Sequence, residues 1–118
     1  MAKVLVVDDE VVVRECLKRG LEAEGHVVIE GENGLEAVEK FRSEAPDIVF
    51  LDVKMPKMDG IEALRNILAV DGEARVVILT GSYDILVERE ARQAGAMDFL
   101  RKGIGFETFM TVARRLLR

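Results

Sequence analysis

Acidic, hydroxyl and amino side chains follow four short apolar runs in this chain. Asp8 and Asp9 come after VLVV, Asp52 after IVFL, Thr80 after VVIL, and Lys102 closely after MDFL. The runs are continuous in apolar residues rather than alternating, which is typical of strands buried on both faces of a parallel sheet. Because ligands gather at the carboxyl ends of the strands in an open α/β sheet, we expect these side chains to meet in one crevice.

Three carboxylates in one crevice need a compensating charge. Two unit charges about 4 Å apart repel by about 4 kcal/mol at an effective dielectric constant near 20. A hard divalent cation relieves this repulsion, and an all-oxygen ligand set suits Mg²⁺ (or Mn²⁺), whereas the sequence offers no His/Cys cluster for zinc. A simpler hypothesis, that each Asp caps the helix after it, accounts for Asp8 and Asp9 alone but not for their convergence with Asp52, Thr80 and Lys102.

A phosphoryl group fits such a crevice. The metal and the Lys102 ammonium would neutralise its oxygens, and the Thr80 hydroxyl would donate a hydrogen bond. A carboxylate can itself be the nucleophile and form an aspartyl phosphate. Asp52 is the better nucleophile because it ends a predicted central strand, whereas the adjacent Asp8 and Asp9 are better suited to holding metal.

Strand and helix patterns alternate five times, which predicts an α/β domain with a parallel sheet and helices on both faces. Strands are expected at 3–7, 27–29, 48–51, 75–79 and 97–100, and helices at 11–24, 33–45, from 59 onward, 84–94 and 106–117. The strand at 27–29 is expected at an edge. Asn33 with Glu36, and Asp59 with Glu62, have the spacing of capping boxes, and Gly95 is a plausible C-terminal cap. The segment GIGF offers no side-chain cap for the last helix.

Helical spacing also predicts which side chains face the core. From the first two helices these are Val13, Cys16, Leu17, Leu21, Leu35, Val38 and Phe41. Cys16 is therefore expected to be a buried small hydrophobe rather than a reactive thiol. His26, the only histidine, lacks partners for a metal and is expected at the surface.

Length and composition predict one domain over residues 1–118, with no output domain in the chain. No apolar stretch approaches the roughly 20 residues that cross a bilayer, and the N-terminus lacks the features of a signal peptide. A single cysteine excludes an internal disulfide and is compatible with a reducing cytoplasm. The net charge of −5 gives no basic footprint, and Arg114, Arg115 and Arg118 suit the end of a helix. We expect a cytoplasmic domain that contacts neither nucleic acid nor membrane.

Four segments, VLVVDDE, DIVFLDVKMPKMDG, VVILTGS and GAMDFLRK, in this order and spacing resemble the receiver domain of two-component response regulators, in stand-alone or single-domain form. The resemblance covers essentially the whole chain. It implies a flavodoxin-like (βα)5 fold, doubly wound, with a five-stranded parallel sheet in the order 2-1-3-4-5. It also implies a phosphoprotein for signal transduction in a phosphorelay. Such a domain is not an enzyme and assists only its own phosphorylation and dephosphorylation.

The resemblance assigns the phosphoacceptor and metal roles. Asp52 would take the phosphoryl group from the phosphohistidine of a sensor histidine kinase or phosphotransfer protein. Asp9, Asp52 and the backbone carbonyl of Lys54 would bind Mg²⁺ directly, and Asp8 would act through a bound water.

The resemblance also implies a switch. Lys102 would pair with the phosphoryl group, Thr80 would swing towards it, and Phe99 would move inward behind Thr80. The face made by the helix at 84–94, the strand at 97–100 and the helix at 106–117 would then change shape and signal to a downstream protein partner. Gly81 would leave room for the phosphoryl group, and Lys54, Ser82 and Tyr83 would either tune access of water or be ordinary solvated loop residues.

One position departs from the family pattern. Receivers usually have Pro after this lysine, with a cis peptide bond between them, whereas Gly103 follows Lys102 here. A cis bond before a non-proline residue costs about 2.5–4 kcal/mol, against about 0.5–1 kcal/mol before Pro. We therefore predict a trans bond and an otherwise intact pocket.

Three alternatives remain open. A small aspartyl-nucleophile phosphatase would place a second acid two residues after the nucleophile, where this chain has Lys54. A flavodoxin-like mononucleotide binder would need a Ser/Thr/Gly phosphate loop after its first strand, where DDE would repel phosphate. A degenerate receiver, acting as a phosphorylation-independent protein-interaction module, is favoured only by Gly103.

Overall fold

The computed structural model describes residues 1–117, so Arg118 of the C-terminal arginines lies outside the described residues. Strands and helices alternate as the sequence predicts. The strands are β1 (Lys3–Val7), β2 (Val27–Gly31), β3 (Ile48–Leu51), β4 (Val76–Thr80) and β5 (Asp98–Arg101). The helices are α1 (Val11–Ala23), α2 (Gly34–Glu44), α3 (Gly60–Val70), α4 (Ile85–Gln93) and α5 (Phe106–Leu116), with a 3₁₀ turn, η1 (Lys102–Ile104), between β5 and α5.

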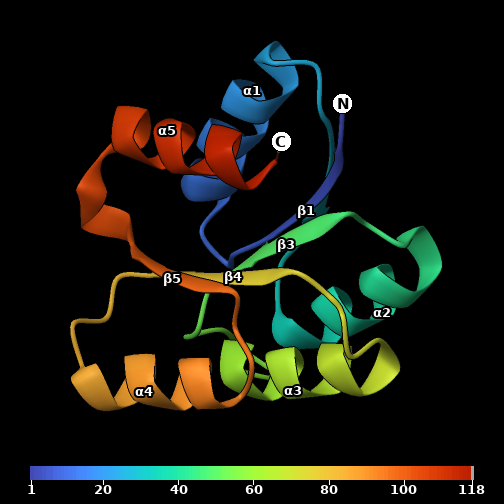
Figure 1. Cartoon of the computed structure of the whole chain (residues 1–118), viewed down its shortest axis with the longest axis vertical. Helices are drawn as coiled ribbons and strands as arrows, with labels where there is room; N and C mark the ends of the chain where they lie inside the picture. The colour runs from blue at the N-terminus through green and yellow to red at the C-terminus, as the bar shows by residue number, and fades with distance from the viewer. Residues whose placement is uncertain (118) are drawn as a thin grey trace.

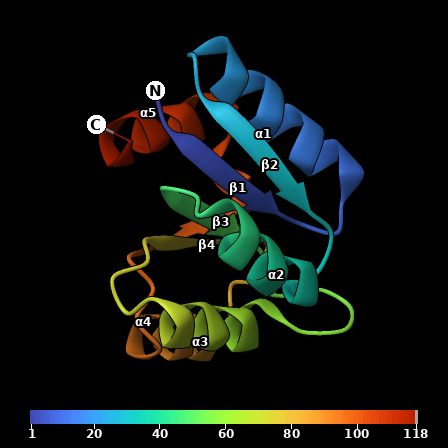
Figure 2. The same cartoon turned by 90° about the vertical axis from the view of Figure 1, so that its right-hand side faces the viewer.

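All five strands are parallel and lie in the order β2-β1-β3-β4-β5, which confirms the predicted flavodoxin-like sheet with β2 at an edge. Helices α1 and α5 cover one face of the sheet, and α2, α3 and α4 cover the other (Figures 1 and 2). The carboxyl ends of β1, β3, β4 and β5 therefore share one edge of the molecule. No helix within residues 1–117 is long and apolar enough to cross a membrane.

Two apolar layers hold the helices to the sheet, and successive strand residues alternate between them. In β1, Leu5 faces the layer under α2, α3 and α4, while Val4 faces the layer under α1 and α5. The rings of Phe50 in β3 and Phe109 in α5 meet edge to face, with centroids 5.2 Å apart. Each large apolar side chain buried in this way contributes about 1.5–3 kcal/mol, so the two layers fix the strand ends firmly.

The predicted helix caps are confirmed. Asn33 Oδ1 accepts a hydrogen bond from the Glu36 N–H at 2.9 Å, and Asp59 Oδ1 accepts one from the Glu62 N–H at 2.9 Å. Gly105 precedes α5 without a side-chain cap, as expected. At the start of α1, the N-cap residue is Glu10 and no side chain caps the helix, so the hypothesis that Asp8 and Asp9 serve as caps is wrong.

Some predictions about individual side chains and strand ends are wrong. Cys16 is exposed, because the buried stripe of α1 passes through residues 14, 17 and 21. Leu35 is also exposed, since the inward face of α2 is formed by Ala37, Val38 and Phe41. His26 is half-buried, and its Nδ1 accepts a hydrogen bond from the Ala2 N–H. Strand β2 runs two residues further than predicted, to Gly31, because it keeps its pairing with β1 to the end of that strand.

Candidate phosphoacceptor site

A cleft of about 330 Å³ opens at the carboxyl ends of the central strands. It is lined by Asp9, Glu10, Asp52, Lys54, Thr80, Gly81, Ser82 and Lys102. Each of these except Glu10 was predicted at the site, so the convergence of the strand ends is confirmed. Asp8 lies beside the cleft against Lys102, and Phe99 is buried in the apolar layer under α2, α3 and α4.

The Lys102 ammonium lies among three carboxylates. Its Nζ is 2.8 Å from Asp8 Oδ2, 3.0 Å from Glu10 Oε1 and 3.1 Å from Asp52 Oδ2. Burial acts to lower the pKa of Lys102, but the hydrogen bonds to these carboxylates together outweigh it and raise the pKa well above its usual value. Lys102 is therefore a permanent cation in the cleft.

The peptide bond after Lys102 is trans, as predicted, since residues 1–117 contain no cis peptide bond. The 3₁₀ turn η1 begins at Lys102 and follows β5 directly. This trans geometry still delivers the Lys102 side chain to Asp52. Gly103 thus leaves the pocket intact, as expected.

The acidic cluster carries more charge than one lysine neutralises. Carboxylate oxygens of Asp8, Asp9, Glu10 and Asp52 lie within 4.8 Å of one another. The donors are all oxygen, and two of the four residues are exposed, so water can complete a coordination shell. These properties fit a hard divalent cation such as Mg²⁺ better than a transition metal.

The charged form of the Asp52 carboxylate is disfavoured in this cleft. Burial, and next the charge of Asp8, raise its pKa above the ordinary value. Hydrogen bonds from Lys102 and from the Val53 N–H, at 3.1 Å and 2.8 Å, offset the rise only in part. Asp52 is buried beside Asp8 and shares its single ammonium with two other carboxylates, so Lys102 does not cancel the rise in its pKa.

This raised pKa predicts a pH-dependent effect of Asp52→Asn. The folded protein binds the Asp52 proton more tightly than the unfolded chain, so the stability that Asp52 contributes is full below pH 3.8 and is lost as the pH rises through the raised folded pKa. We expect Asp52→Asn to raise the free energy of unfolding near neutral pH without divalent cations, and to raise it less as the pH falls towards 4. Urea unfolding across this pH range measures the difference. Asp71→Asn, at an exposed loop position, is the control, and a gain for Asp52→Asn that does not change with pH would contradict the prediction.

The wall of the cleft opposite the acidic cluster is formed by the end of β4 and the loop after it. Thr80 is buried, and its Oγ1 accepts a hydrogen bond from the Ser82 N–H at 3.2 Å. A Cβ atom at Gly81 would meet nothing within 4 Å, so the cleft is open on that side, as expected. The Lys54 side chain is exposed at the rim.

Arg101 connects this wall to α4, and no pattern in the sequence predicts this contact. The register of β4 and β5 pairs Arg101 with Thr80. Its guanidinium lies over the rings of Phe99 and Tyr83, 5.1 Å and 5.4 Å from their centroids, and 3.3 Å from Glu88 Oε1 in α4. Arg101 therefore joins the end of β4, which it pairs with through the backbone register, to Glu88 in α4.

Two residues near the acidic cluster were also missed. Glu10 contacts Lys102, and the acidic run DDE was the signal for it. Arg14 is buried on α1. The sequence feature that could have indicated it is a cation at helical spacing with the apolar Leu17 and Leu21.

Known proteins share this fold and sequence pattern. The response regulator receiver domain family matches residues 4–114. The chemotaxis protein CheY of Bacillus subtilis is 42% identical over 101 residues, covering 85% of this chain and 84% of that protein. The response regulator MprA of Mycobacterium ulcerans is 36% identical over 116 residues, covering 98% of this chain and 50% of that protein. The crystal structure of a CheX–CheY–BeF3–Mg²⁺ complex from Borrelia burgdorferi matches with a TM-score of 0.90 and 32% identity, covering 98% of this chain and 89% of that chain.

The chain therefore belongs to the response regulator receiver domain family. This confirms the resemblance drawn from the sequence and makes the chain a signalling domain of the two-component type, with a phosphoacceptor role in general terms. The chain spans most of the length of the CheY relative and half the length of the MprA relative.

Proposed function

We propose that Asp52 accepts a phosphoryl group from the phosphohistidine of a sensor histidine kinase or phosphotransfer protein. The observation that carries this proposal is the Asp52 carboxylate in an open cleft, with the Lys102 ammonium 3.1 Å from it. A carboxylate oxygen of Asp52 attacks phosphorus and forms an O–P bond while the P–N bond to the histidine breaks. The released imidazole takes up a proton from solvent, and Asp52 becomes an aspartyl phosphate.

The reaction depends on Mg²⁺, for which Mn²⁺ can substitute. Asp9, Asp52 and the backbone carbonyl of Lys54 would hold the ion, and Asp8 would act through a bound water. When bound, the ion neutralises charge on the phosphoryl oxygens. The Lys102 ammonium pairs with a second phosphoryl oxygen, and the Thr80 hydroxyl donates a hydrogen bond to a third. Gly81, Ser82 and the Lys54 side chain govern how the phosphoryl group and water enter.

The face made by α4, β5 and α5 communicates the phosphorylation of Asp52 to a partner. Phosphorylation adds about −1.5 to −2 units of charge and draws the Thr80 hydroxyl towards Asp52. Thr80 pairs with Arg101, which contacts Glu88 in α4 and lies over the Phe99 ring, so this movement shifts the balance between two arrangements of the face. A downstream protein partner binds the arrangement that phosphorylation favours, with Phe99 packed behind Thr80.

Incubation with acetyl phosphate and Mg²⁺ tests the proposal. We expect intact mass spectrometry to show one phosphoryl adduct in the wild type and none in Asp52→Asn. Asp59→Asn is the matched control, because Asp59 is an exposed helix cap outside the cleft and an Asn side chain can still cap the helix. An adduct that survives in Asp52→Asn would refute the assignment. A wild type without any adduct would favour the phosphorylation-independent interaction module, and multiple turnover of small phosphate esters would favour a phosphatase.

A further inference from the structure

Arg14 in α1 is the only Lys or Arg within residues 1–117 that is buried, with 7% of its surface exposed. Burying a charge is unfavourable unless it is paired and hydrogen-bonded. An apolar side chain at position 14 would be buried without that penalty. The partners of Arg14 therefore show what the cation does there.

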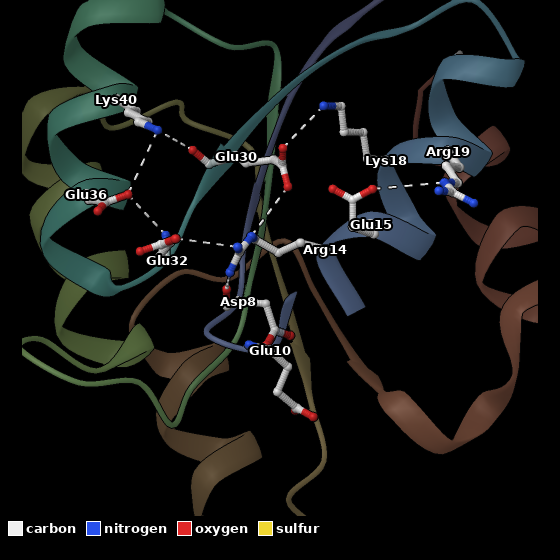
Figure 3. A network of polar contacts seen from close by, with 10 residues as sticks. All are labelled: Asp8, Glu10, Arg14, Glu15, Lys18, Arg19, Glu30, Glu32, Glu36 and Lys40. Atoms are coloured by element: carbon white, nitrogen blue, oxygen red, sulfur yellow. Dashed lines mark hydrogen bonds and ion pairs between the residues drawn. The ribbon is translucent and has the colours of Figure 1, made fainter. Parts of the chain in front are cut away.

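The shortest contact of Arg14 is to a backbone carbonyl rather than to a carboxylate (Figure 3). Its Nη1 donates a buried hydrogen bond to the Asp8 carbonyl oxygen at 2.6 Å. The two ion pairs are longer: Nε lies 3.4 Å from Glu30 Oε1, and Nη2 lies 3.6 Å from Glu32 Oε1. The guanidinium is thus directed towards the end of β1, and the two glutamates pair with its Nε and Nη2 atoms.

The carbonyl that Arg14 binds belongs to the peptide group joining Asp8 to Asp9. The orientation of this peptide plane sets the direction in which the Asp9 side chain leaves the backbone. Two other hydrogen bonds hold the same turn: the Asp8 N–H donates to the Gly31 carbonyl at 3.1 Å, and the Glu10 N–H donates to Asp8 Oδ1 at 2.9 Å. Of these contacts, the one from Arg14 acts on the peptide that leads into Asp9.

The glutamates that hold Arg14 are themselves fixed by neighbours from two helices. Glu30 Oε2 lies 3.3 Å from Lys18 Nζ in α1, and the Glu30 carbonyl accepts a hydrogen bond from Lys40 in α2. The Glu32 N–H donates to Glu36 Oε1 at 3.2 Å (Figure 3). Because α1, β2 and α2 all contribute, Arg14 has little freedom to leave the Asp8 carbonyl.

We propose that Arg14 is a positioning residue for the divalent cation site. Its hydrogen bond to the Asp8 carbonyl orients the Asp9 carboxylate towards the ion that Asp9 and Asp52 share. This inference rests on the proposed function, in which Asp9 binds Mg²⁺. Removing a residue that orients a metal ligand without binding the metal typically weakens metal affinity by about 10–100-fold. We expect a loss in that range here.

Two substitutions of Arg14 and one control separate positioning from general stability. Arg14→Met removes the donor and the charge, whereas Arg14→Lys keeps the charge but loses the planar fork that reaches the carbonyl and both glutamates. Lys18→Met is the control because Lys18 also pairs with Glu30 but makes no contact with Asp8. Circular dichroism and urea unfolding without Mg²⁺ first establish the conditions under which each protein is folded.

Isothermal titration with MgCl2 then measures the dissociation constant of each folded protein. We expect Arg14→Met to weaken Mg²⁺ binding by about tenfold or more, Arg14→Lys to weaken it by less, and Lys18→Met to leave it within about twofold. The rate of phosphorylation by acetyl phosphate should fall for Arg14→Met at low Mg²⁺ and recover largely at saturating Mg²⁺, which a purely structural role would not produce. If Arg14→Met does not fold, the affinity of Arg14→Lys is compared with those of the wild type and Lys18→Met instead.

The outcomes distinguish this inference from the proposed function. A wild type that binds Mg²⁺ and is phosphorylated, together with a folded Arg14→Met or Arg14→Lys protein that binds Mg²⁺ equally tightly, overturns the role of Arg14 alone. An equal loss of affinity in Lys18→Met also overturns it, because the effect would then follow from Glu30 rather than from the Asp8 carbonyl. A wild type that binds no Mg²⁺ overturns the proposed function and this inference with it.

Discussion

Replacing Lys102 with Met is expected to lower the free energy of unfolding by about 2–3 kcal/mol in the absence of divalent cations, somewhat less than the 3–5 kcal/mol typical of a fully buried pair. The substitution removes the ammonium that lies within 3.1 Å of Asp8, Glu10 and Asp52. These carboxylates would then repel one another without the ammonium that offsets the repulsion. The reduction from the fully buried value reflects the exposure of Glu10, which lets solvent screen part of the charge.

Mg²⁺ should reverse this loss. The ion and Lys102 both neutralise Asp8 and Asp52, so Lys102→Met should bind Mg²⁺ more tightly than the wild type, opposite in sign to Arg14→Met. Urea unfolding with and without MgCl2 measures both effects. Lys54→Met serves as the control, because Lys54 lines the same cleft with an exposed side chain. Equal losses of stability in Lys54→Met and Lys102→Met would show that the effect is one of net charge rather than of this contact.

Gly60→Ala is expected to destabilise the fold by about 3 kcal/mol, at the upper end for forcing a methyl group into a packed site. Gly60 is the first residue of α3, and a Cβ atom there would clash with the Asp52 carbonyl oxygen and lie 2.9 Å from Val53 Cα. The helix and the strand end would have to separate. Because Asp52 would move with its backbone, the rate of phosphorylation should fall as well, by up to about 100-fold for a displacement near 1 Å.

Gly81→Ala is the matched control for Gly60→Ala. Gly81 lies in the wall of the same cleft, but a Cβ atom there meets nothing within 4 Å. We expect its free energy of unfolding to stay within about 0.5 kcal/mol of the wild type. Urea unfolding is measured for both variants, and the acetyl phosphate rate of Gly60→Ala is compared with that of the wild type. A stable Gly60→Ala protein with an unchanged rate would show that α3 can withdraw without disturbing Asp52.

The order of the strands and the residues that line the cleft could be predicted because both depend on regular patterns. Buried parallel strands are continuous in apolar residues, and strands in register end at one edge of the sheet. The errors arose where a single position decides the outcome. Helical spacing predicted that Cys16, next to Leu17, lies on the buried face of α1. In the structure, Arg14 rather than Cys16 shares the buried face with Leu17.

Beyond the convergence of the strand ends, the individual side-chain contacts between distant segments could not be predicted in this way. Glu10 and Lys102 are 3.0 Å apart although 92 positions separate them in the sequence. The run DDE indicates an additional acid at this edge of the sheet, but no local pattern pairs that acid with Lys102. The partners of Arg14 include a backbone carbonyl, which has no sequence signature at all. The trans bond at Gly103 was predictable for the opposite reason, since its energy depends on two neighbouring residues only.

The edge strand β2 also affects how the protein behaves at high concentration. An unpaired strand edge offers backbone groups to a strand from another molecule and so promotes aggregation. The Gly31 carbonyl points towards β1, where it accepts the Asp8 N–H, so alternation directs the Glu30 carbonyl to the open side of the sheet. Lys40 donates to that carbonyl and places a charge at the edge. The lysine that helps to fix Glu30 thereby also hinders the joining of two sheets edge to edge.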